Sequence, residues 1–476
     1  MTRLARNTTF LTVATIGQKI VAFVYFALIA RIVGVEWTGT YFLALSITTM
    51  VGVIADFGLT PVLVRDAAKH PQRERELLGA IFGLKIGLTI VAALVAVMVT
   101  HAFDHDALTR QLVYMATIVM ALDTVHLTCF GVFRARHRLG IESLGIFVGM
   151  VITLVVGVAS LLIRPSLPIL IIALVAGSSW NVGYVVWHLV RRDVRPWRVT
   201  WYWPSVKRLL RIAWPFALAA IFVKIYSTTD ALLLEWYLGE AAVGLYAIAY
   251  KLTYAFQFFP LAFVAALYPT FSAQIQAKDR DALLKTFEDA FWYMLMLSVP
   301  VILGLWAVAD VLIPAVYGLE FVGSIQPFRI LIFVLFFIFL DFPIGALLNA
   351  DDRQHVKTFM MGGTMVINVA LNVLLIPRFG IIGACIAALV GFAFLFGAGL
   401  VAARTSLPYD GAHLIKRGAP IVLSGLVMAL TVLLLKSWIG LGGSVVLGAI
   451  VYGGGLLATR SLTLTQIKQF VLEWRT

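Results

Sequence analysis

The chain has 476 residues, of which 61% are hydrophobic and only 13% are charged, and its formal net charge is +13. A soluble globular protein would carry about 25% charged residues, so this composition excludes one and indicates a protein that crosses a membrane many times. The positive charge is concentrated in the loops between apolar runs, where it governs orientation, so it does not indicate nucleic-acid binding.

Apolar runs of roughly 20 residues recur from one end of the chain to the other, and each is long enough to cross about 30 Å of hydrocarbon as a helix. They predict an all-α integral membrane fold with about fourteen transmembrane helices and no room for a soluble domain. In chain order the predicted spans are 9–33, 38–64, 78–100, 109–133, 140–163, 168–190, 208–236, 243–270, 290–313, 326–350, 356–377, 380–403, 414–436 and 439–459.

The loops between these spans differ sharply in positive charge. With an even number of spans, both tails and alternate loops share one side, and that side carries 27 lysines and arginines against five on the other. Basic segments next to spans tend to stay in the cytoplasm. We therefore expect a multi-pass protein with both termini in the cytoplasm and short outer loops.

No motif for a catalytic or metal site stands out. Cys129 and Cys385 both fall inside predicted spans, which favours neither a disulfide nor a metal site. Nothing in the sequence resembles a P-loop, a zinc site, a haem ligand pair or a hydrolase motif. We expect no enzymatic activity, no metal and no cofactor beyond a coupling proton or sodium ion.

Two segments of the chain resemble each other. Residues 14–46, "ATIGQKIVAFVYFALIARIVGVEWTGTYFLALS", align without gaps with residues 219–251, "AAIFVKIYSTTDALLLEWYLGEAAVGLYAIAYK", and nine of 33 positions are identical. Both contain G-x4-G-x-Y, a turn followed by an interfacial aromatic residue. The matched pairs are Gly34 with Gly239, Gly39 with Gly244, Tyr41 with Tyr246, and Lys19 with Lys224.

Such a repeat predicts two lobes of six spans each. The expected N-lobe comprises residues 1–200 and the C-lobe residues 201–405, while residues 406–476 add two C-terminal helices and a cytoplasmic tail. Because six is even, the lobes share one orientation and should be related by a pseudo-twofold axis along the membrane normal.

Charged residues inside spans are costly, by about 2.5 to 3.5 kcal/mol at a helix centre, so they are normally paired or face water. Lys19 and Lys224 lie too deep for their ammonium groups to reach either surface; they either face a polar cavity or belong to structural ion pairs. Arg31, Lys85 and Glu235 lie nearer the span ends, where snorkelling to the headgroups is the plain interpretation.

Four aspartates inside spans are also candidates for a functional role. Asp230 and Lys251 lie at matching depths on consecutive antiparallel spans and are expected to form an ion pair. That pair either fastens the two spans together or opens when a proton or an anionic substrate competes for one partner. Asp56, Asp123 and Asp341 are single carboxylates, each either a structural residue, protonated or hydrogen-bonded, or a candidate for ion coupling.

Three stretches carry a family resemblance: "RIVGVEWTGTYFLALS" followed by "DFGL", "TDALLLEWYLGEAAVGLYAIAYKL", and "IPRFGIIGACIAALV". Together with the six-plus-six-plus-two arrangement, they make the chain resemble the multidrug/oligosaccharidyl-lipid/polysaccharide (MOP) exporter superfamily over nearly its whole length. Within it, the chain is most similar to the polysaccharide transporter branch, which contains O-antigen and lipid-linked oligosaccharide flippases. The resemblance implies two lobes around a central cavity, alternating access, a polyprenyl-diphosphate-linked glycan as substrate, and the cytoplasmic (inner) membrane of a prokaryote.

The resemblance also implies that spans 1 and 7 line the cavity. We expect Lys19 and Lys224, with Lys251 and Arg31 in support, to bind the diphosphate headgroup, because lysine is a suitable point charge for phosphate. The candidates for ion coupling or gating are Asp230, Asp56, Asp123 and Asp341. The expected partners are the glycan lipid, membrane lipids and glycan-assembly enzymes, and no nucleic acid.

Two other functions compete with this hypothesis. A multidrug exporter of the same superfamily would bind organic cations in an acidic cavity, which the deep lysines argue against. An integral-membrane glycosyltransferase or glycan polymerase would use the same lipid-linked substrate. Such an enzyme usually needs sizeable outer loops with catalytic carboxylates or arginines, whereas the outer loops here are short.

Overall fold

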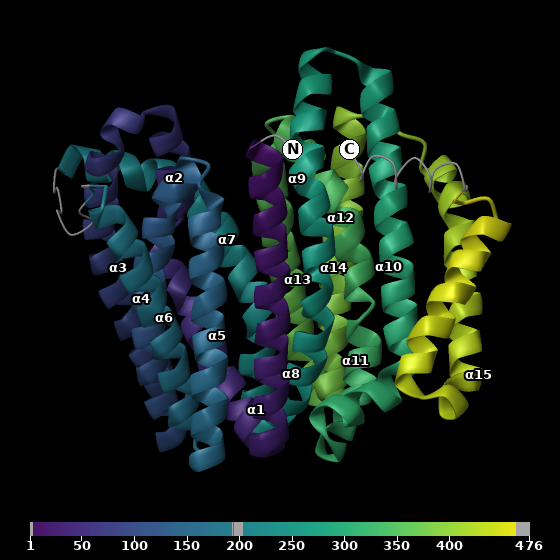
Figure 1. Cartoon of the computed structure of the whole chain (residues 1–476), viewed down its shortest axis with the longest axis horizontal. Coiled ribbons are helices and arrows are strands. Elements are labelled where there is room, and N and C mark those ends of the chain that lie inside the picture. Colours follow the sequence, from purple (N-terminus) through teal and green to yellow (C-terminus); the bar gives the residue numbers. More distant parts are fainter. Residues whose placement is uncertain (1–2, 193, 195–202, 463–476) are drawn as a thin grey trace. The chain divides into compact units, whose positions relative to one another are not determined.

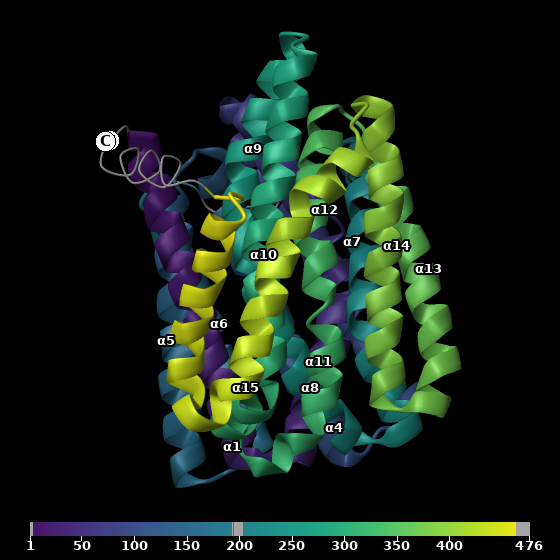
Figure 2. The same cartoon turned by 90° about the vertical axis from the view of Figure 1, so that its right-hand side faces the viewer.

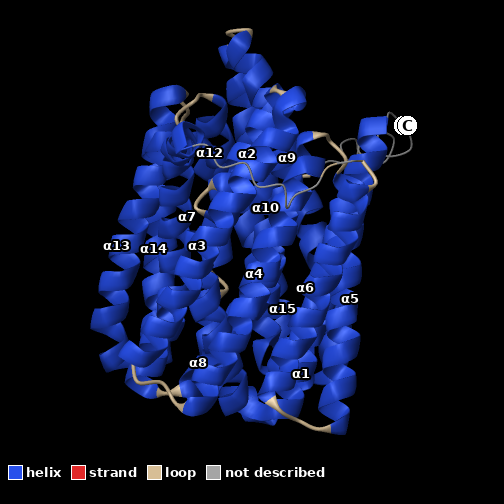
Figure 3. Cartoon of the chain, turned by 90° about the vertical axis from the view of Figure 1, so that its left-hand side faces the viewer, coloured by secondary structure: helices blue, strands red, loops and turns tan. Residues whose placement is uncertain are grey.

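The computed structural model describes residues 3–192, 194 and 203–462. Within these ranges every regular element is a helix and no strand occurs (Figure 3). Eleven of the described helices are long and apolar enough to cross a membrane. The predicted all-helical membrane fold is therefore confirmed. Only helices and closed barrels satisfy every backbone hydrogen bond inside lipid, which explains why apolar runs of this length fold in this way.

The chain divides into two compact units, Met1–Ala247 and Ile248–Thr476. In the first unit, long helices joined by short turns run up and down beside one another (Figure 1). Its helices are α1 (Arg3–Asp56), α2 (Leu59–Lys69), η1 (Pro71–Arg73), α3 (Glu74–Ala102), α4 (Ala107–Ala135), α5 (Leu139–Ile163), α6 (Leu167–Val190), α7 (Trp203–Leu238) and the first half of α8 (Glu240–Tyr254).

Helix α1 contains more than one expected span. Its backbone leaves the helical region at Gly34, with φ 78° and ψ −177°, and this turn separates span 9–33 from span 38–64. Glycine suits the position because it has no Cβ atom to clash at positive φ. The second span is itself interrupted, since Phe57 and Gly58 both have positive φ before α2 begins.

The second unit holds the remaining helices, with η2 and η3 as short 3-10 segments. They are the second half of α8, η2 (Ala255–Gln257), α9 (Phe258–Gln276), α10 (Arg280–Tyr317), η3 (Leu319–Ser324), α11 (Ile325–Leu331), α12 (Val334–Ala350), α13 (Gln354–Phe379), α14 (Ile381–Ser406) and α15 (Gly411–Ala458). Helix α15 folds back on itself at Gly440, where φ is 65°, and forms two antiparallel arms (Figure 2). These arms correspond to the last two expected spans.

Two further expected spans differ from the prediction, and one of them, 326–350, is divided between α11 and α12. Residues 243–270 do not form a single helix, because the 3-10 segment at Ala255–Gln257 separates α8 from α9. Each unit nevertheless has its own buried apolar core. In the first unit Phe130 and Phe133 of α4 are fully buried, and in the second Phe271 of α9 and Phe287 of α10 are. These cores hold the helices that carry the charged side chains described below.

Candidate functional site

The four cations expected to bind a diphosphate lie on three helices. Lys19 and Arg31 are exposed side chains of α1, whereas Lys224, near the middle of α7, is half-buried. Helices α1 and α7 pack against each other within the first unit. Lys251 is an exposed residue of α8 and belongs to the second unit. The headgroup-binding role of all four stays a prediction.

The sequence repeat corresponds to matched backbone geometry. Gly34 and Gly239, which the alignment pairs, both have positive φ, of 78° and 81°. The next matched glycines lie at a close contact between the two repeats. A Cβ atom on Gly39 would lie 1.9 Å from the carbonyl oxygen of Glu240, and one on Gly244 would lie 2.0 Å from that of Val35. Only glycine permits this backbone approach.

The matched tyrosines are buried and hold equivalent positions. The Tyr246 hydroxyl donates to Asp230 Oδ2 at 2.5 Å, and Tyr41 forms a side-chain hydrogen bond with Tyr25. Residues 25 and 230 occupy the same place in the repeat alignment, so Asp230 stands where the first repeat has a tyrosine. The expected ion pair between Asp230 and Lys251 joins residues of different units and stays a prediction.

A carboxylate joins three helices at the end of the first unit that the charge pattern places outside. Glu240, the first residue of α8, accepts hydrogen bonds from Thr40 Oγ1 of α1 at 2.5 Å and from Thr109 Oγ1 of α4 at 3.0 Å. We call Glu240, Thr40 and Thr109 the outer clamp. Burial raises the pKa of Glu240, the two hydroxyl donors oppose that shift, and the nearby carboxylates of Asp106 and Glu36 add to it.

A second contact supports the outer clamp. His105 Nδ1, in the turn between α3 and α4, lies 3.3 Å from the Glu235 carboxylate of α7. Beside it, the ring of Phe103 meets that of Trp236 edge to face, with centroids 5.4 Å apart. Sequence reasoning missed Glu240, His105 and their partners. It interpreted Glu235 as snorkelling, whereas the structure gives that carboxylate a histidine partner.

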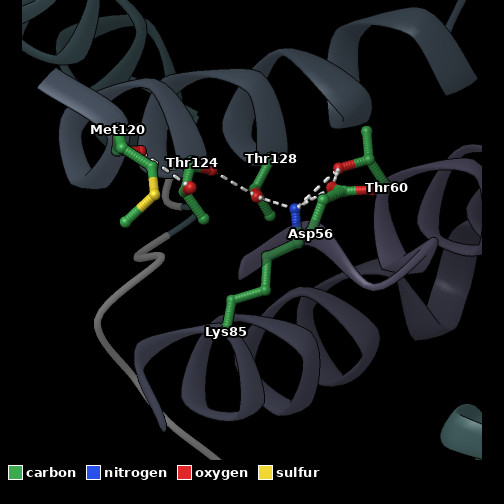
Figure 4. A network of polar contacts seen from close by, with 6 residues as sticks. All are labelled: Asp56, Thr60, Lys85, Met120, Thr124 and Thr128. Carbon is green, nitrogen blue, oxygen red and sulfur yellow. Dashed lines mark hydrogen bonds and ion pairs between the residues drawn. The ribbon is translucent and has the colours of Figure 1, made fainter. Parts of the chain in front are cut away.

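Lys85 of α3 and Asp56 of α1 form an ion pair within the first unit (Figure 4). The Lys85 ammonium of α3 donates to Asp56 Oδ1 at 2.5 Å, to Thr60 Oγ1 at 2.6 Å and to Thr128 Oγ1 at 2.8 Å. Thr60 also donates to Asp56. A lysine has three N–H donors, and each has a partner here. The network therefore joins α1, α2, α3 and α4 through one charge.

The snorkelling interpretation of Lys85 is wrong. Its side chain is only 3% exposed, and its ammonium turns inward to the pair instead of outward to the headgroups. The physical reason is that three oxygen atoms from three other helices converge on the nitrogen, which offsets the cost of removing the charge from water. Distance along the sequence to the end of a span gives no information about such partners.

The other two carboxylates have different partners. Asp341 of α12 lies 3.5 Å from the Lys357 ammonium of α13. Asp123 of α4 accepts a hydrogen bond from Ser178 Oγ of α6 at 2.6 Å and lies 3.0 Å from His126 Nε2. Asp56 and Asp341 thus each face a lysine, whereas Asp123 faces an imidazole. Their roles in coupling or gating stay predictions.

The second unit contains a large apolar groove of about 1420 Å³, bounded by α10, α12, α14 and α15. Phe291, Phe336 and Phe396 line it, and on the α15 side Ile415 and Leu423 are 74% and 57% exposed. Drug-sized pockets measure about 300 to 1,000 Å³, so this groove can hold a longer apolar molecule. Sequence patterns did not reveal it.

Two basic side chains lie at one end of this groove, where α14 ends and α15 begins. Arg404 and Lys416 both line the groove there, and the guanidinium of Arg404 lies 5.4 Å from the centroid of the Tyr409 ring. Cations at the end of an apolar groove match a ligand with a hydrocarbon chain and an anionic head.

Two family models match the sequence of this chain. The family model described as polysaccharide biosynthesis protein matches residues 4–276, and the MatE model matches residues 215–374. Among curated proteins, the chain is similar to the probable low-salt glycan biosynthesis flippase Agl15 of Haloferax volcanii, at 23% identity over 397 residues that cover 82% of this chain and 81% of that protein.

Solved structures show the same fold. A structure of the lipid II flippase MurJ in an inward closed conformation matches with a TM-score of 0.74 and 14% identity, over 94% of this chain and 97% of that chain. An inward-facing multidrug resistance MATE family transporter of the MOP superfamily matches with a TM-score of 0.66 and 14% identity, over 84% and 96%. At these identities the likeness shows the fold alone.

Proposed function

Because the chain belongs to the polysaccharide biosynthesis protein family, within the MOP superfamily, we propose that it is a flippase for a polyprenyl-diphosphate-linked oligosaccharide. Such a substrate has three parts with different needs. The hydrocarbon tail can stay in lipid, the diphosphate needs cations, and the glycan needs a polar path. Alternation of the two units between conformations would move the polar parts across, with no bond made or broken.

The apolar groove of the second unit is the observation that carries this proposal. Its volume of about 1420 Å³ suits a polyprenyl chain, and Arg404 and Lys416 at its end suit a phosphate next to that chain. A substrate without a long hydrocarbon chain would need no such groove. The glycan-flippase relative of similar length supports the same substrate class.

Cations of the first unit support the requirement for positive charge next to the diphosphate. Lys19 and Lys224 occupy matched positions in the sequence repeat, on α1 and α7. In this proposal they bind the diphosphate during translocation, with Arg31 and Lys251 as further candidates. Lysine can both hold and release a phosphate, since it forms point-charge contacts and lacks the fixed fork of arginine.

A drug exporter fits the observed charges less well. An organic cation needs an available carboxylate, yet Asp56 is bound by Lys85 and Asp341 lies beside Lys357. The MatE match over residues 215–374 makes this the second candidate function, and the same experiment can test both.

The test uses the purified chain reconstituted in liposomes. One set contains a polyprenyl-diphosphate oligosaccharide with a fluorescent glycan, and a membrane-impermeant quencher reports which leaflet holds it. A second set contains the organic cation ethidium. We expect glycan lipid to cross at a rate well above that of protein-free liposomes, with no ethidium transport. Ethidium transport without movement of the glycan lipid would contradict the proposal and establish the second candidate.

A further inference from the structure

A second cavity of the second unit lies away from Arg404 and Lys416, toward the end that the charge pattern places outside. Figure 2 shows α11 at the same end of the unit as the turn of α15 at Gly440. The cavity has a volume of about 430 Å³, and we call it the outer pocket. Its lining residues come from α10, α11, the start of α12 and α14, and they are Trp306, Gln326, Arg329, Ile330, Phe333 and Leu389.

The outer pocket continues the apolar groove along the same helix faces. Leu389 of the pocket and Phe396 of the groove are about two turns apart on α14, and each pair of this spacing shares a face. Trp306 and Leu295 are about three turns apart on α10 in the same way. Leu389 lies about 22 Å from Arg404 along the axis of α14, at 1.5 Å per residue. The two cavities thus follow one line of helix faces, with basic residues at both ends.

Two cations share one carboxylate beside the outer pocket. The Lys436 ammonium of α15 donates to both oxygens of the Asp310 carboxylate of α10 at 2.6 Å. Arg329 Nη2 lies 3.6 Å from Asp310 Oδ1, which is longer than a hydrogen bond. These three side chains therefore carry a net charge of +1. Since the cluster joins α10, α11 and α15, it holds the positive charge at a fixed place beside the pocket.

The Arg329 guanidinium keeps donors for another acceptor. In the part of the chain that the structure describes, it donates one hydrogen bond, from Nε to the Trp306 carbonyl oxygen at 3.3 Å. A guanidinium has five N–H donors in a planar fork. The Trp306 ring, with its centroid 5.4 Å from the guanidinium carbon, helps to hold that fork in place. Gln326, an exposed residue about one turn before Arg329, adds an amide to the same lining.

We propose that the outer pocket binds the diphosphate of a polyprenyl lipid whose chain lies in the apolar groove. The fork of Arg329 matches phosphate oxygens, and the net positive charge of the cluster complements the anion. The apolar walls formed by Ile330, Phe333 and Leu389 continue toward the groove. The inference rests on the proposed function: the headgroup lies near Arg404 and Lys416 before translocation, and at Arg329 after it.

The direct test measures occupancy of the outer pocket without transport. The full chain, with benzoylphenylalanine in place of Phe333, is irradiated in phosphatidylcholine nanodiscs together with tritiated geranyl diphosphate. The short chain of this probe cannot reach from one end of the groove to the other, so labelling reports a headgroup near the pocket. Geraniol is the uncharged control. We expect it to label the protein several-fold less, and equal labelling by the two probes would overturn the proposal.

Two charge variants distinguish an anion site from a structural ion pair. R329Q and D310N both break the contact between Arg329 and Asp310, so a purely structural role predicts that both lower the labelling. An anion site predicts opposite changes. R329Q should lower labelling several-fold because the fork is gone, whereas D310N should raise it several-fold because Arg329 and Lys436 lose their shared counterion.

The matched control for these variants is R378Q. Arg378 is an exposed arginine near the end of α13, in the same unit, and it does not line the outer pocket. R378Q should leave the labelling unchanged, and thermal unfolding verifies that every variant is folded. Lower labelling in both R329Q and D310N, unchanged labelling in R329Q, or an equal loss in R378Q would overturn the site.

An ordinary phospholipid is the competing occupant. A diphosphate carries more negative charge than the phosphodiester of a phospholipid, so it should gain more from the positive cluster. Labelling by geranyl diphosphate should therefore persist in nanodiscs of phosphatidylglycerol. Its loss there would show that an anionic phospholipid takes the pocket, and would overturn the proposal.

The two proposals can fail separately. If the outer pocket is labelled and the charge variants respond in opposite directions while the wild type moves no glycan lipid in liposomes, the diphosphate site stands and the transport function is wrong. If the wild type flips the glycan lipid while R329Q is labelled as strongly as the wild type, the function stands and the site is wrong.

Discussion

The Lys85 ammonium lies 2.5 Å from the Asp56 carboxylate, and the lysine side chain is almost fully buried whereas the aspartate is 39% exposed. The buried ammonium of Lys85 thus depends on Asp56 for its stabilisation far more than the exposed carboxylate of Asp56 depends on Lys85. The exposed carboxylate retains contact with its surroundings, but the ammonium has only Asp56, Thr60 and Thr128. Removal of the carboxylate should therefore destabilise the protein more than removal of the ammonium.

We expect D56N to destabilise the protein more than K85M. The D56N change leaves a buried ammonium with no counterion, a loss on the order of 3 kcal/mol, whereas K85M leaves a partly exposed carboxylate at a cost of roughly half that. The double variant D56N/K85M should be more stable than D56N alone, because no charge remains unpaired. Thermal unfolding in detergent, followed by tryptophan fluorescence, measures the order of stability of these variants.

The exposed lysine at the end of α2 provides the control, since K69M should unfold at the same temperature as the wild type. Equal stability of D56N and the wild type would show that the pair contributes nothing, and a double variant less stable than D56N would show that Lys85 is held by other contacts.

The contact between Gly39 and Glu240 predicts a strict size limit. A Cβ atom at Gly39 would lie 1.9 Å from a backbone oxygen, which no side-chain rotation relieves. The G39A change should therefore separate the two repeats at this end. A cysteine at the fully buried position Val243 reports the change by its labelling with a membrane-impermeant maleimide, because both native cysteines are buried. We expect labelling to rise several-fold.

Gly183 is the matched control, because a Cβ atom there meets nothing within 4 Å. G183A should leave the labelling of V243C low. If G39A also leaves it low, the observed approach of the backbones is not needed to close this end.

The outer clamp should respond to pH. A carboxyl whose pKa is raised in the closed form binds protons more tightly there than when it is open and solvated, so the closed form gains stability as pH falls. That gain is complete below the ordinary glutamate value of 4.5 and is lost as pH rises through the raised pKa of Glu240. Labelling of V243C, divided at each pH by that of the same thiol in unfolded protein because maleimide reacts with the thiolate, should therefore increase as pH rises from about 4.5.

The E240Q variant is the control for this response. Glutamine cannot ionise but can still accept hydrogen bonds from Thr40 and Thr109, so its V243C labelling, divided at each pH by that of the same thiol in unfolded protein, should stay low and independent of pH. A pH response in E240Q equal to that of the wild type would assign the effect to a group other than Glu240.

Filling the apolar groove should block the lipid substrate. Gly397 lines the groove, and a Cβ atom there meets nothing within 4 Å. G397F should therefore fold normally while its ring occupies space meant for a hydrocarbon chain, and it should slow glycan-lipid flipping about tenfold or more. G454F adds the same ring at an exposed glycine of α15 that also has open space, and does not line the groove. Equal flipping rates in the two variants would remove the groove from the transport path.

Local features of this protein could be predicted from the sequence. Hydropathy alone identified the apolar helices, because insertion into lipid depends on the composition of each run. The repeat predicted equivalent turns, and Gly34 and Gly239 indeed share a positive φ. Composition and a few glycines were enough for these statements because each concerns neighbours in the chain.

Contacts between distant residues could not be predicted in the same way. Glu240 is 200 residues from Thr40 and 131 from Thr109, and nothing in the repeat assigns it a partner. Lys85 finds its oxygens 25 to 43 residues away on other helices. The groove depends on which apolar faces remain uncovered after packing, and these helices are apolar around most of their circumference in the sequence.

The central claim is that cations on α1 and α7 carry a diphosphate-linked glycan across the membrane, and one measurement tests it most directly. The flipping rate of a polyprenyl-diphosphate oligosaccharide is compared in liposomes for the wild type, for K19A/K224A, and for K278A/K285A, which removes two exposed lysines outside the predicted spans. With equal thermal stability of all three, we expect K19A/K224A to lose flipping and K278A/K285A to keep it. Unimpaired flipping by a well-folded K19A/K224A protein would contradict the claim.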